Sequence, residues 1–210
     1  MNAIQLLKQD HKTVRGLLSD LEATTRRALK RRGELLAKVA REIDVHTRIE
    51  EEIFYPAFKQ AGDRGEDAKL YHEAREEHRA AGEMVLPDLL KTAPDSEEFG
   101  GRAKVLKELV EHHAREEERE MFPRARQLLT AAQLRELGER MMERKQELLA
   151  GSVAAVKRAG QGLVGAVSSL VGSDDEDDAA ERGLRSSGDG GRRPPRASSG
   201  SRSGAGRARN

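Results

Sequence analysis

His46-Thr-Arg-Ile-Glu50-Glu-Glu-Ile-Phe-Tyr-Pro56 and His113-Ala-Arg-Glu-Glu117-Glu-Arg-Glu-Met-Phe-Pro123 are two copies of one pattern. In each copy a glutamate follows the histidine by four residues, and a proline follows that glutamate by six. A further histidine lies 35 residues before each copy, in the dipeptides Asp10-His11 and Glu77-His78. The chain therefore repeats one helical hairpin, and each hairpin supplies two histidines and one glutamate.

Composition places the chain among all-helical proteins. Of its 210 residues 36% are hydrophobic, 36% charged and only 3% aromatic, and Leu, Ala, Glu, Lys and Arg dominate. Because there is no cysteine, disulfides, thiolate zinc sites and iron–sulfur clusters are excluded, and any metal must be bound by nitrogen and oxygen. A net charge of +1 argues against a specific nucleic-acid surface. With no signal peptide and no apolar run of about 18 residues, we expect a cytoplasmic protein without a transmembrane segment.

Apolar residues recur at alternating intervals of three and four, which indicates amphipathic helices. The first helix is expected from Asn2, its N-cap, to about Thr25, and a basic turn over residues 26–33 should lead to the second. Pro56 and the glycine-rich residues 62–65 are predicted to end the second helix, because proline interrupts helical hydrogen bonding.

The remaining helices follow from similar signals. The third is expected from Glu66, with a kink or a stop at Pro87, and the fourth should be capped by Asp95 or Ser96. A capping box at residues 130–133 should open a fifth helix. Short loops between the first four helices predict an all-α, up-down-up-down four-helix bundle, with the fifth helix packed against its outside or its end.

The chain changes character after the fifth helix. Residues 1–150 form the predicted bundle domain, whereas residues 151–172 form a weakly amphipathic segment interrupted by glycines. Residues 173–210 hold an acidic run and then a Gly-, Ser- and Arg-rich stretch with almost nothing to bury, so we expect a disordered tail. The arginines of this tail could contact RNA or an acidic partner, but solvated disorder is the favoured interpretation.

Polar side chains occupy matching positions in the inward-facing stripes of the four bundle helices. They are His11, His46, Glu50, His78, His113 and Glu117. A single histidine on an apolar face is usually a hydrogen-bonded core residue, but six matched donors need another explanation. Two buried carboxylates in one layer are costly unless positive charge neutralises them, and the stripes contain no Lys or Arg. One or two metal cations are the simplest source of that charge.

The pattern also predicts room for a ligand. In an antiparallel bundle His11 should lie near His46, and His78 near His113, with the two glutamates between the pairs. Two metal ions, each with two imidazoles and sharing both carboxylates, would use about four positions of an octahedral shell. The free positions favour chemistry or ligand binding over a closed structural site. Imidazole with carboxylate suits iron, manganese or zinc.

These residues resemble the hemerythrin-like family, also called the hemerythrin HHE cation-binding domain. The resemblance rests on Asp10-His11, Glu77-His78 and the two longer copies with their terminal prolines, and it covers roughly residues 1–148. It implies a four-helix bundle with a non-haem di-iron centre that binds dioxygen or related small molecules. It further implies two iron ions, with the four histidines as terminal ligands and Glu50 and Glu117 as bridging ligands; manganese or zinc is less favoured.

Two departures from the oxygen-carrying hemerythrins bear on the expected activity. Those proteins usually carry a fifth histidine one turn before the third-helix ligand, where this chain has Ala74, and they use His-x-x-x-x-Asp where it has His113-x-x-x-Glu117. The missing imidazole implies a more open iron, which favours reaction with peroxide, nitric oxide or dioxygen over reversible oxygen carriage. The alternative is an iron-responsive sensor or storage module without turnover.

Several neighbouring residues are weaker candidates for metal ligands. His72 lies off the inward stripe and is expected on the surface or beside the ligands. His112, with Glu116 four residues after it, could compete with His113, but the repeat aligns His113 and not His112. Tyr55 is expected in the core at the end of its helix, with a phenolate ligand as the alternative. Glu51 and Glu118 follow the proposed bridging glutamates and are expected to support the site or to face solvent.

Overall fold

The computed structural model describes the backbone of residues 1–171 and the side chains of residues 1–151. All regular secondary structure among these residues is helical, which confirms the predicted fold class. The chain divides into two compact units, Met1–Leu163 and Val164–Asn210. The tail predicted to be disordered, residues 173–210, lies outside the described part. Within that part no helix is long and apolar enough to cross a membrane.

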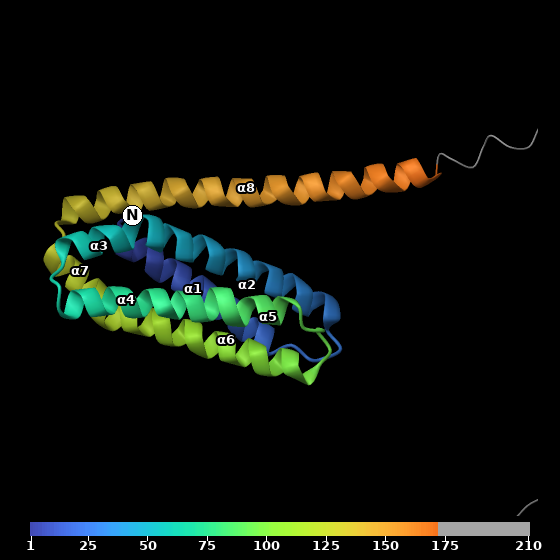
Figure 1. Cartoon of the computed structure of the whole chain (residues 1–210), viewed down its shortest axis with the longest axis horizontal. Helices are drawn as coiled ribbons and strands as arrows, with labels where there is room; N and C mark the ends of the chain where they lie inside the picture. Colours follow the sequence, from blue (N-terminus) through green and yellow to red (C-terminus); the bar gives the residue numbers. More distant parts are fainter. Residues whose placement is uncertain (172–210) are drawn as a thin grey trace, which may run out of the picture. The chain divides into compact units, whose positions relative to one another are not determined.

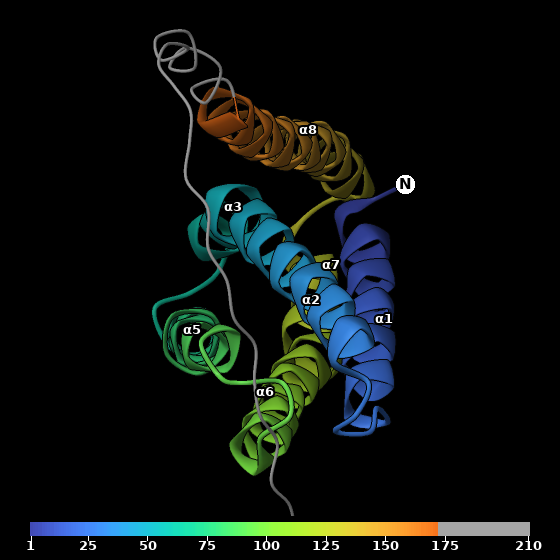
Figure 2. The same cartoon turned by 90° about the vertical axis from the view of Figure 1, so that its right-hand side faces the viewer.

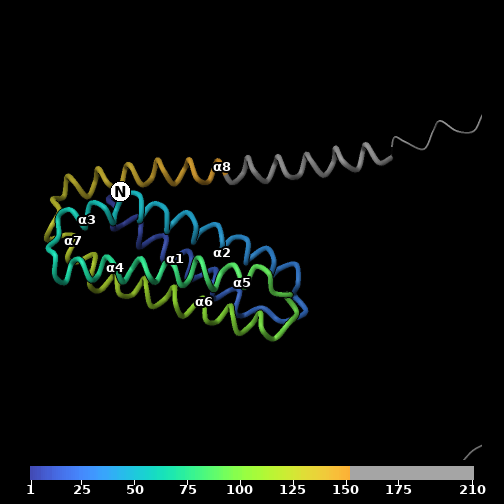
Figure 3. Tube along the Cα trace, viewed as in Figure 1, coloured from blue at the N-terminus to red at the C-terminus, as the bar shows by residue number. Residues whose placement is uncertain are grey.

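Four helical rods form the bundle (Figures 1 and 2). They are α1 (Ala3–Glu22); α2 (Leu29–Ile49) with η1 (Glu50–Phe54) and α3 (Tyr55–Ala61); α4 (Glu66–His78) with η2 (Arg79–Val85) and α5 (Leu86–Leu90); and α6 (Glu97–Glu116) with η3 (Glu117–Met121) and α7 (Phe122–Leu128). The three η segments are π-helical. Following the trace in Figure 3, each rod runs opposite to the one before it, as the up-down-up-down prediction requires. The fifth helix is α8 (Ala131–Val171).

Local side-chain chemistry sets several helix starts. Asn2 accepts a hydrogen bond from the Gln5 amide, and the Gln5 side chain accepts one from the Asn2 amide, so a capping box opens α1. Ser96 caps α6 through its hydroxyl, and Thr130 and Gln133 form the predicted capping box before α8. These N-terminal predictions are confirmed because a cap depends only on neighbouring residues.

Some other boundaries were predicted wrongly. α1 ends at Glu22, before the expected end near Thr25. α2 begins at Leu29, inside the expected turn, because Gly33 is tolerated within the helix. The backbone of α8 stays helical through the glycines of residues 151–171, where an interruption was expected. Glycine weakens a helix by only about 1 kcal/mol per residue, which a long helix can absorb.

Pro56 does not end its helix as predicted, and Pro87, predicted to kink or stop its helix, does not stop it. Pro56, Pro87 and Pro123 each lie just after a π turn, in which the amide before the proline donates to the carbonyl five residues back. Proline has no amide proton, and its ring clashes with the carbonyl four residues earlier in an α-helix. A wider turn accommodates the ring. The second rod therefore continues past its proline and ends at Ala61, before Gly62.

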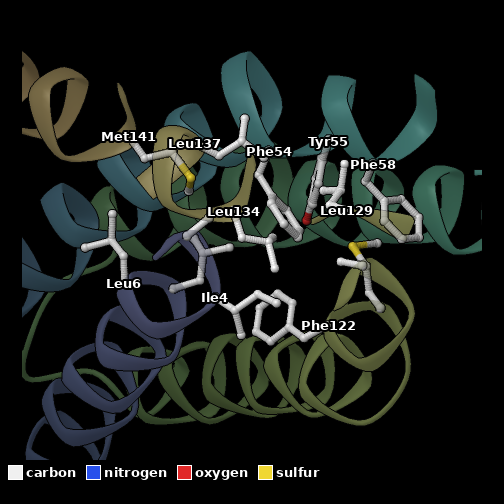
Figure 4. Close-up of a cluster of buried hydrophobic side chains, with 14 of the residues drawn as sticks. Ile4, Leu6, Phe54, Tyr55, Phe58, Phe122, Leu129, Leu134, Leu137 and Met141 are labelled. Atoms are coloured by element: carbon white, nitrogen blue, oxygen red, sulfur yellow. The ribbon is translucent and has the colours of Figure 1, made fainter. Parts of the chain in front are cut away.

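Two apolar clusters fill the bundle, one toward each end. One cluster contains Val14, Leu18, Leu35, Val39, Phe99 and Leu106, among others. The other joins the bundle to α8 and includes Ile4, Leu7, Phe54, Tyr55, Phe122, Leu134, Leu137 and Met141 (Figure 4). On α1 the boundary between the clusters falls between Leu7 and Val14, where His11 lies. The core is thus interrupted by a polar layer.

Helix α8 is docked closely onto the start of α1. A Cβ atom added at Gly138 would lie 2.5 Å from the Met1 carbonyl oxygen and 2.7 Å from the Ala3 nitrogen, so only glycine permits this approach. Further along, Arg144 pairs with Glu52 at 2.7 Å. The prediction of a fifth helix against the bundle is confirmed, and its contacts bring polar side chains near the buried layer.

Candidate metal centre

The six predicted donors come from all four rods of the bundle. His11 lies in α1, His46 in α2 and His113 in α6, while His78 is the last residue of α4. Glu50 and Glu117 are the first residues of the π segments η1 and η3. All six side chains are buried, and Glu50 is 0% exposed. The helical phase that the sequence indicates therefore does turn these side chains away from solvent.

The imidazoles form two pairs with the carboxylates between them. Ring centroids are 4.9 Å apart for His11 and His46 and 4.6 Å apart for His78 and His113. Oε2 of Glu50 lies 3.1 Å from Nε2 of His46 and 3.2 Å from Nε2 of His78.

Glu117 occupies the matching position in the other half of the site. Its Oε2 lies 3.1 Å from Nε2 of His11 and 3.7 Å from Nε2 of His113. Each glutamate thus approaches one histidine of each pair, which is the placement expected of a carboxylate shared by two cations.

Several of these buried polar atoms have no hydrogen-bond partner. They are both oxygens of Glu50, Oε2 of Glu117, Nε2 of His11, and both ring nitrogens of His46. Such atoms are rare in folded proteins, because each unpaired one costs about 1–3 kcal/mol, and more when charged. Donor atoms of His11, His46, Glu50, His113 and Glu117 all lie within 4.8 Å of one another. The donor set fits a metal cation, which would bind the carboxylate oxygens and the Nε2 atoms; Nδ1 of His46 faces Asp10 instead.

The electrostatics of the site reflect this crowding. Burial would raise the pKa of Glu50, but the imidazoles of His46, His113 and His78 outweigh it and hold that pKa well below its usual range. Burial would lower the pKa of His113, yet Glu117 and Glu50 raise it well above the ordinary value. The ionised form of Glu50, which is the form that binds a cation, is therefore favoured.

Outer carboxylates hold three of the four imidazoles through Nδ1. The pairs are His11 with Glu118 at 2.9 Å, His78 with Glu51 at 3.1 Å, and His113 with Glu77 at 2.9 Å. A partner on Nδ1 fixes the ring and leaves Nε2 free for a metal. The sequence predicts that Glu51 and Glu118 either support the site or face solvent, and it indicates no role for Glu77. Their recurrence in the repeat was the available signal.

The two halves of the site differ in one aromatic residue. Tyr55 stacks on His78 with ring centroids 5.4 Å apart, and Phe122, at the equivalent place in the repeat, stacks on His11 at 5.8 Å. The Tyr55 hydroxyl donates to Oε1 of Glu117 at 3.0 Å. Burial and the nearby carboxylates of Glu117 and Glu50 raise the pKa of Tyr55 well above its usual value. In this structure Tyr55 is a protonated donor to the site.

The other two histidines lie outside this centre. His72 is exposed and packs its ring edge against Tyr71. His112 is 57% exposed and lies 3.3 Å from both Glu77 and Glu116. Glu77, His112 and Glu116 form a small second group nearer the surface. Glu77 links this group to the buried centre through its contact with His113.

A small cavity adjoins the imidazoles. Its volume is about 30 Å³, and its lining includes all four histidines together with Ile43, Thr47, Ala81 and Val110. A surface groove of about 670 Å³ runs between α2 and α4, and Ile43, Thr47 and His78 line both spaces. These three residues therefore lie between the cavity and the groove.

Fold and site together define a four-helix bundle protein with a buried histidine–carboxylate centre suited to metal ions. The family model described as "Hemerythrin HHE cation binding domain" matches residues 2–125, and the chain belongs to this family. The resemblance inferred from the repeated motif is confirmed.

Several known proteins are similar to this chain in sequence or structure. The uncharacterized protein Rv2633c of Mycobacterium tuberculosis is 30% identical over 162 residues, which are 77% of this chain and 96% of that protein. The crystal structure of a hemerythrin HHE cation binding domain-containing protein from Mycobacterium kansasii, an Rv2633c homolog, has a TM-score of 0.65 and 30% identity, covering 75% of this chain and 93% of that one. A protein named DNA nickase from Nostoc is 26% identical over 133 residues, only 36% of its own length.

Proposed function

We propose that residues 1–150 form a non-haem di-iron module that binds or reacts with a small oxygen or nitrogen species: dioxygen, peroxide or nitric oxide. Membership of a cation-binding family and the buried donor set support the metal. His11 with His46 would hold one ion and His78 with His113 the other, with Glu50 and Glu117 shared. Iron bound there would supply a redox-active centre with coordination positions free for the ligand.

The observation that carries the choice of ligand is the size of the cavity beside the imidazoles. A water molecule needs roughly 10–15 Å³ of such space, so a cavity of about 30 Å³ suits a diatomic molecule or a peroxide better than a larger organic substrate. The apolar side chains of Ile43, Ala81 and Val110 on its wall limit the water that can enter. The groove that shares Thr47 and His78 with this cavity is the proposed route of entry.

Side chains around the centre fix its orientation. The carboxylates on Nδ1 hold three imidazoles in place, and the Tyr55 hydroxyl holds one oxygen of Glu117 through its hydrogen bond. These groups restrain the donors before any metal arrives. The protein thus supports a preorganised centre, and preorganisation keeps metal affinity high when coordination positions are left open for a ligand.

The first test is metal content together with the optical spectrum. Protein loaded with ferrous iron and exposed to air is expected to hold two irons per chain and to absorb in the near ultraviolet as oxo-bridged iron does. Glu50→Ala and His113→Ala should each lower iron content and melting temperature together, whereas His72→Ala, an exposed control, should change neither. Iron content that is unaffected by Glu50→Ala would remove that residue from the centre.

A second measurement separates a reactive centre from a sensor or store. Iron-loaded protein is mixed with hydrogen peroxide, or with nitric oxide, and consumption is followed over many equivalents. Catalytic consumption supports the proposal that the centre reacts with these species. A ligand-induced spectral change without turnover would support the binding function alone. No spectral change and no consumption with dioxygen, peroxide or nitric oxide would contradict the proposed function.

A further inference from the structure

Three of the four imidazoles are supported by a chain of charged groups that ends on a cation or a second imidazole within the bundle. Arg15 of α1 contacts Glu118 at 3.0 Å, and Glu118 holds His11. Arg75 of α4 contacts Glu51 at 3.4 Å, and Glu51 holds His78. The third chain joins His112, Glu77 and His113. The bundle helices alone therefore hold these three rings.

The fourth imidazole depends on helix α8. The carboxylate nearest to Nδ1 of His46 belongs to Asp10, whose Oδ2 is 3.9 Å away. Asp10 is equivalent in the repeat to Glu77 but is one methylene shorter. Its other oxygen, Oδ1, accepts a hydrogen bond from Nζ of Lys145 at 2.5 Å. Lys145 lies in α8, outside the four rods, so the carboxylate of Asp10 on α1 is restrained by a residue from outside the bundle.

The contact between Asp10 and Lys145 is well protected from solvent. The Asp10 side chain is 6% exposed and that of Lys145 is 16% exposed. Oδ2 of Asp10 and Nδ1 of His46 are both buried without a hydrogen-bond partner. Nδ1 of His46 is thus less firmly held than Nδ1 of the other three rings, and the carboxylate that faces it, Asp10 of α1, is bonded in turn to Lys145 of α8.

We propose that Lys145 is a positioning residue which, through Asp10 and His46, couples docking of α8 to retention of one of the two metal ions. The ion held by His46 is the one that is lost first when α8 separates from the bundle, and the ion held by His78 and His113 stays. Coupling of this kind is reciprocal, so metal at His46 also stabilises the docked helix. The inference rests on the proposed two-metal centre.

The test compares two neighbouring residues of α8 in the full chain. Lys145→Met removes the cation from Asp10, whereas Arg144→Met removes its contacts with Glu52 and Glu147. Both of these contacts are exposed ion pairs, which contribute little to docking. Protein loaded with two equivalents of ferrous iron without oxygen is mixed with a colorimetric chelator, and release is timed. Lys145→Met is expected to release one of its two ions about tenfold faster, the usual effect of losing an outer support. Arg144→Met should release both as the wild type does.

Hydrogen exchange distinguishes loss of the coupling from general destabilisation of the fold, because it reports whether metal binding protects α8. In the wild type, loading with metal is expected to slow amide exchange in residues 131–151, and in Lys145→Met this slowing should disappear. Gly138→Val, which forces α8 away from the backbone of Met1 and Ala3, should accelerate release of the same single ion.

Two results would overturn the inference. One is equal release rates for Lys145→Met and Arg144→Met, and the other is exchange in α8 that ignores the metal in the wild type. If the wild type holds two ions, either result contradicts the proposed coupling between α8 and the metal and leaves the proposed function intact. A wild type that cannot be loaded with two ions defeats the proposed function itself.

Discussion

At the scale of single residues, the two copies of the repeat supply matching donors but differ at one aromatic position. Tyr55 occupies that position in the first copy and Phe122 in the second. Both rings stack on a histidine, so both fill the same kind of space. Only Tyr55 adds a hydroxyl, and this hydroxyl donates to Glu117. The two proposed metal positions therefore have different surroundings even though their proposed ligands match.

Tyr55→Phe is expected to keep the fold and most of the metal, because phenylalanine already fills the equivalent place at 122. Removing the hydrogen bond to a buried carboxylate should lower the free energy of unfolding by about 1.5–3 kcal/mol. The optical spectrum of the iron-loaded protein should also shift, since Oε1 of Glu117 loses its donor. Urea denaturation and the absorption spectrum measure the two effects. Tyr71→Phe serves as the control, and an equal spectral shift there would contradict the prediction.

At the scale of elements, the π turns connect the prolines of the repeat to the site. Glu50 and Glu117 each open such a turn, and their carbonyls accept from the amides of Tyr55 and Phe122. π turns often occur at functional sites because they place an extra residue in one turn. The same short segment therefore carries the shared carboxylate, its outer neighbour and the aromatic ring that stacks on an imidazole.

Ion pairs also hold loops and helix ends in place. One of them joins Arg124 to Asp67, whose side chain is buried. This side chain, at the start of α4, accepts from Nε of Arg124 in α7 at 2.7 Å and from the Asp63 amide at 2.9 Å. The Arg124 guanidinium lowers the pKa of Asp67, against the opposing effect of burial. A carboxyl with a lowered pKa stabilises the fold above its unfolded value of about 3.9, and this stability is lost as pH falls through the folded value.

Asp67→Asn is therefore expected to lower the melting temperature at pH 7 and to make the loss of stability in acid shallower. Thermal denaturation between pH 7 and about pH 3 measures both effects. Glu97→Gln removes an exposed carboxylate that pairs with Arg26 and should leave the acid dependence almost unchanged. An acid dependence of Asp67→Asn identical to that of the wild type would show that Asp67 does not contribute this stability.

At the scale of the whole molecule, the polar layer joins two hairpins and divides the core between two apolar clusters. Without a cation, the carboxylates of Glu50 and Glu117 lie buried with unpaired oxygens. A metal that binds only the folded chain stabilises it through mass action. Stability of the bundle and metal occupancy are thus expected to change together.

Removal of metal by a chelator should lower the melting temperature of the wild type. With free metal at about a thousand times its dissociation constant, the stabilisation is about 4 kcal/mol. His72→Ala should show the same loss on chelation, whereas His113→Ala, which lacks a donor, should show a much smaller one. Calorimetry with and without chelator measures this difference, and equal melting temperatures for the loaded and stripped wild type would contradict it.

The sequence alone determined the repeated hairpin, the all-α bundle and the inward direction of six donors. Helical phase is a local property: each residue turns the helix by the same angle, so the spacing of His46 and Glu50 decides which way both point. Helix caps such as Asn2 were predictable for the same reason. The expected end at Pro56 was wrong, and Pro87 does not stop its rod, because a π turn before each proline accommodates the ring.

Only the tertiary structure decided which groups meet across the bundle. Glu51 on His78, Glu118 on His11, and Lys145 on Asp10 join residues 27, 107 and 135 positions apart. Such contacts depend on how helices interlock and on the close approach that Gly138 allows, and no local periodicity encodes them. The donors of the centre are thus set by helical phase, whereas their support, and its difference between the two halves, is set by packing.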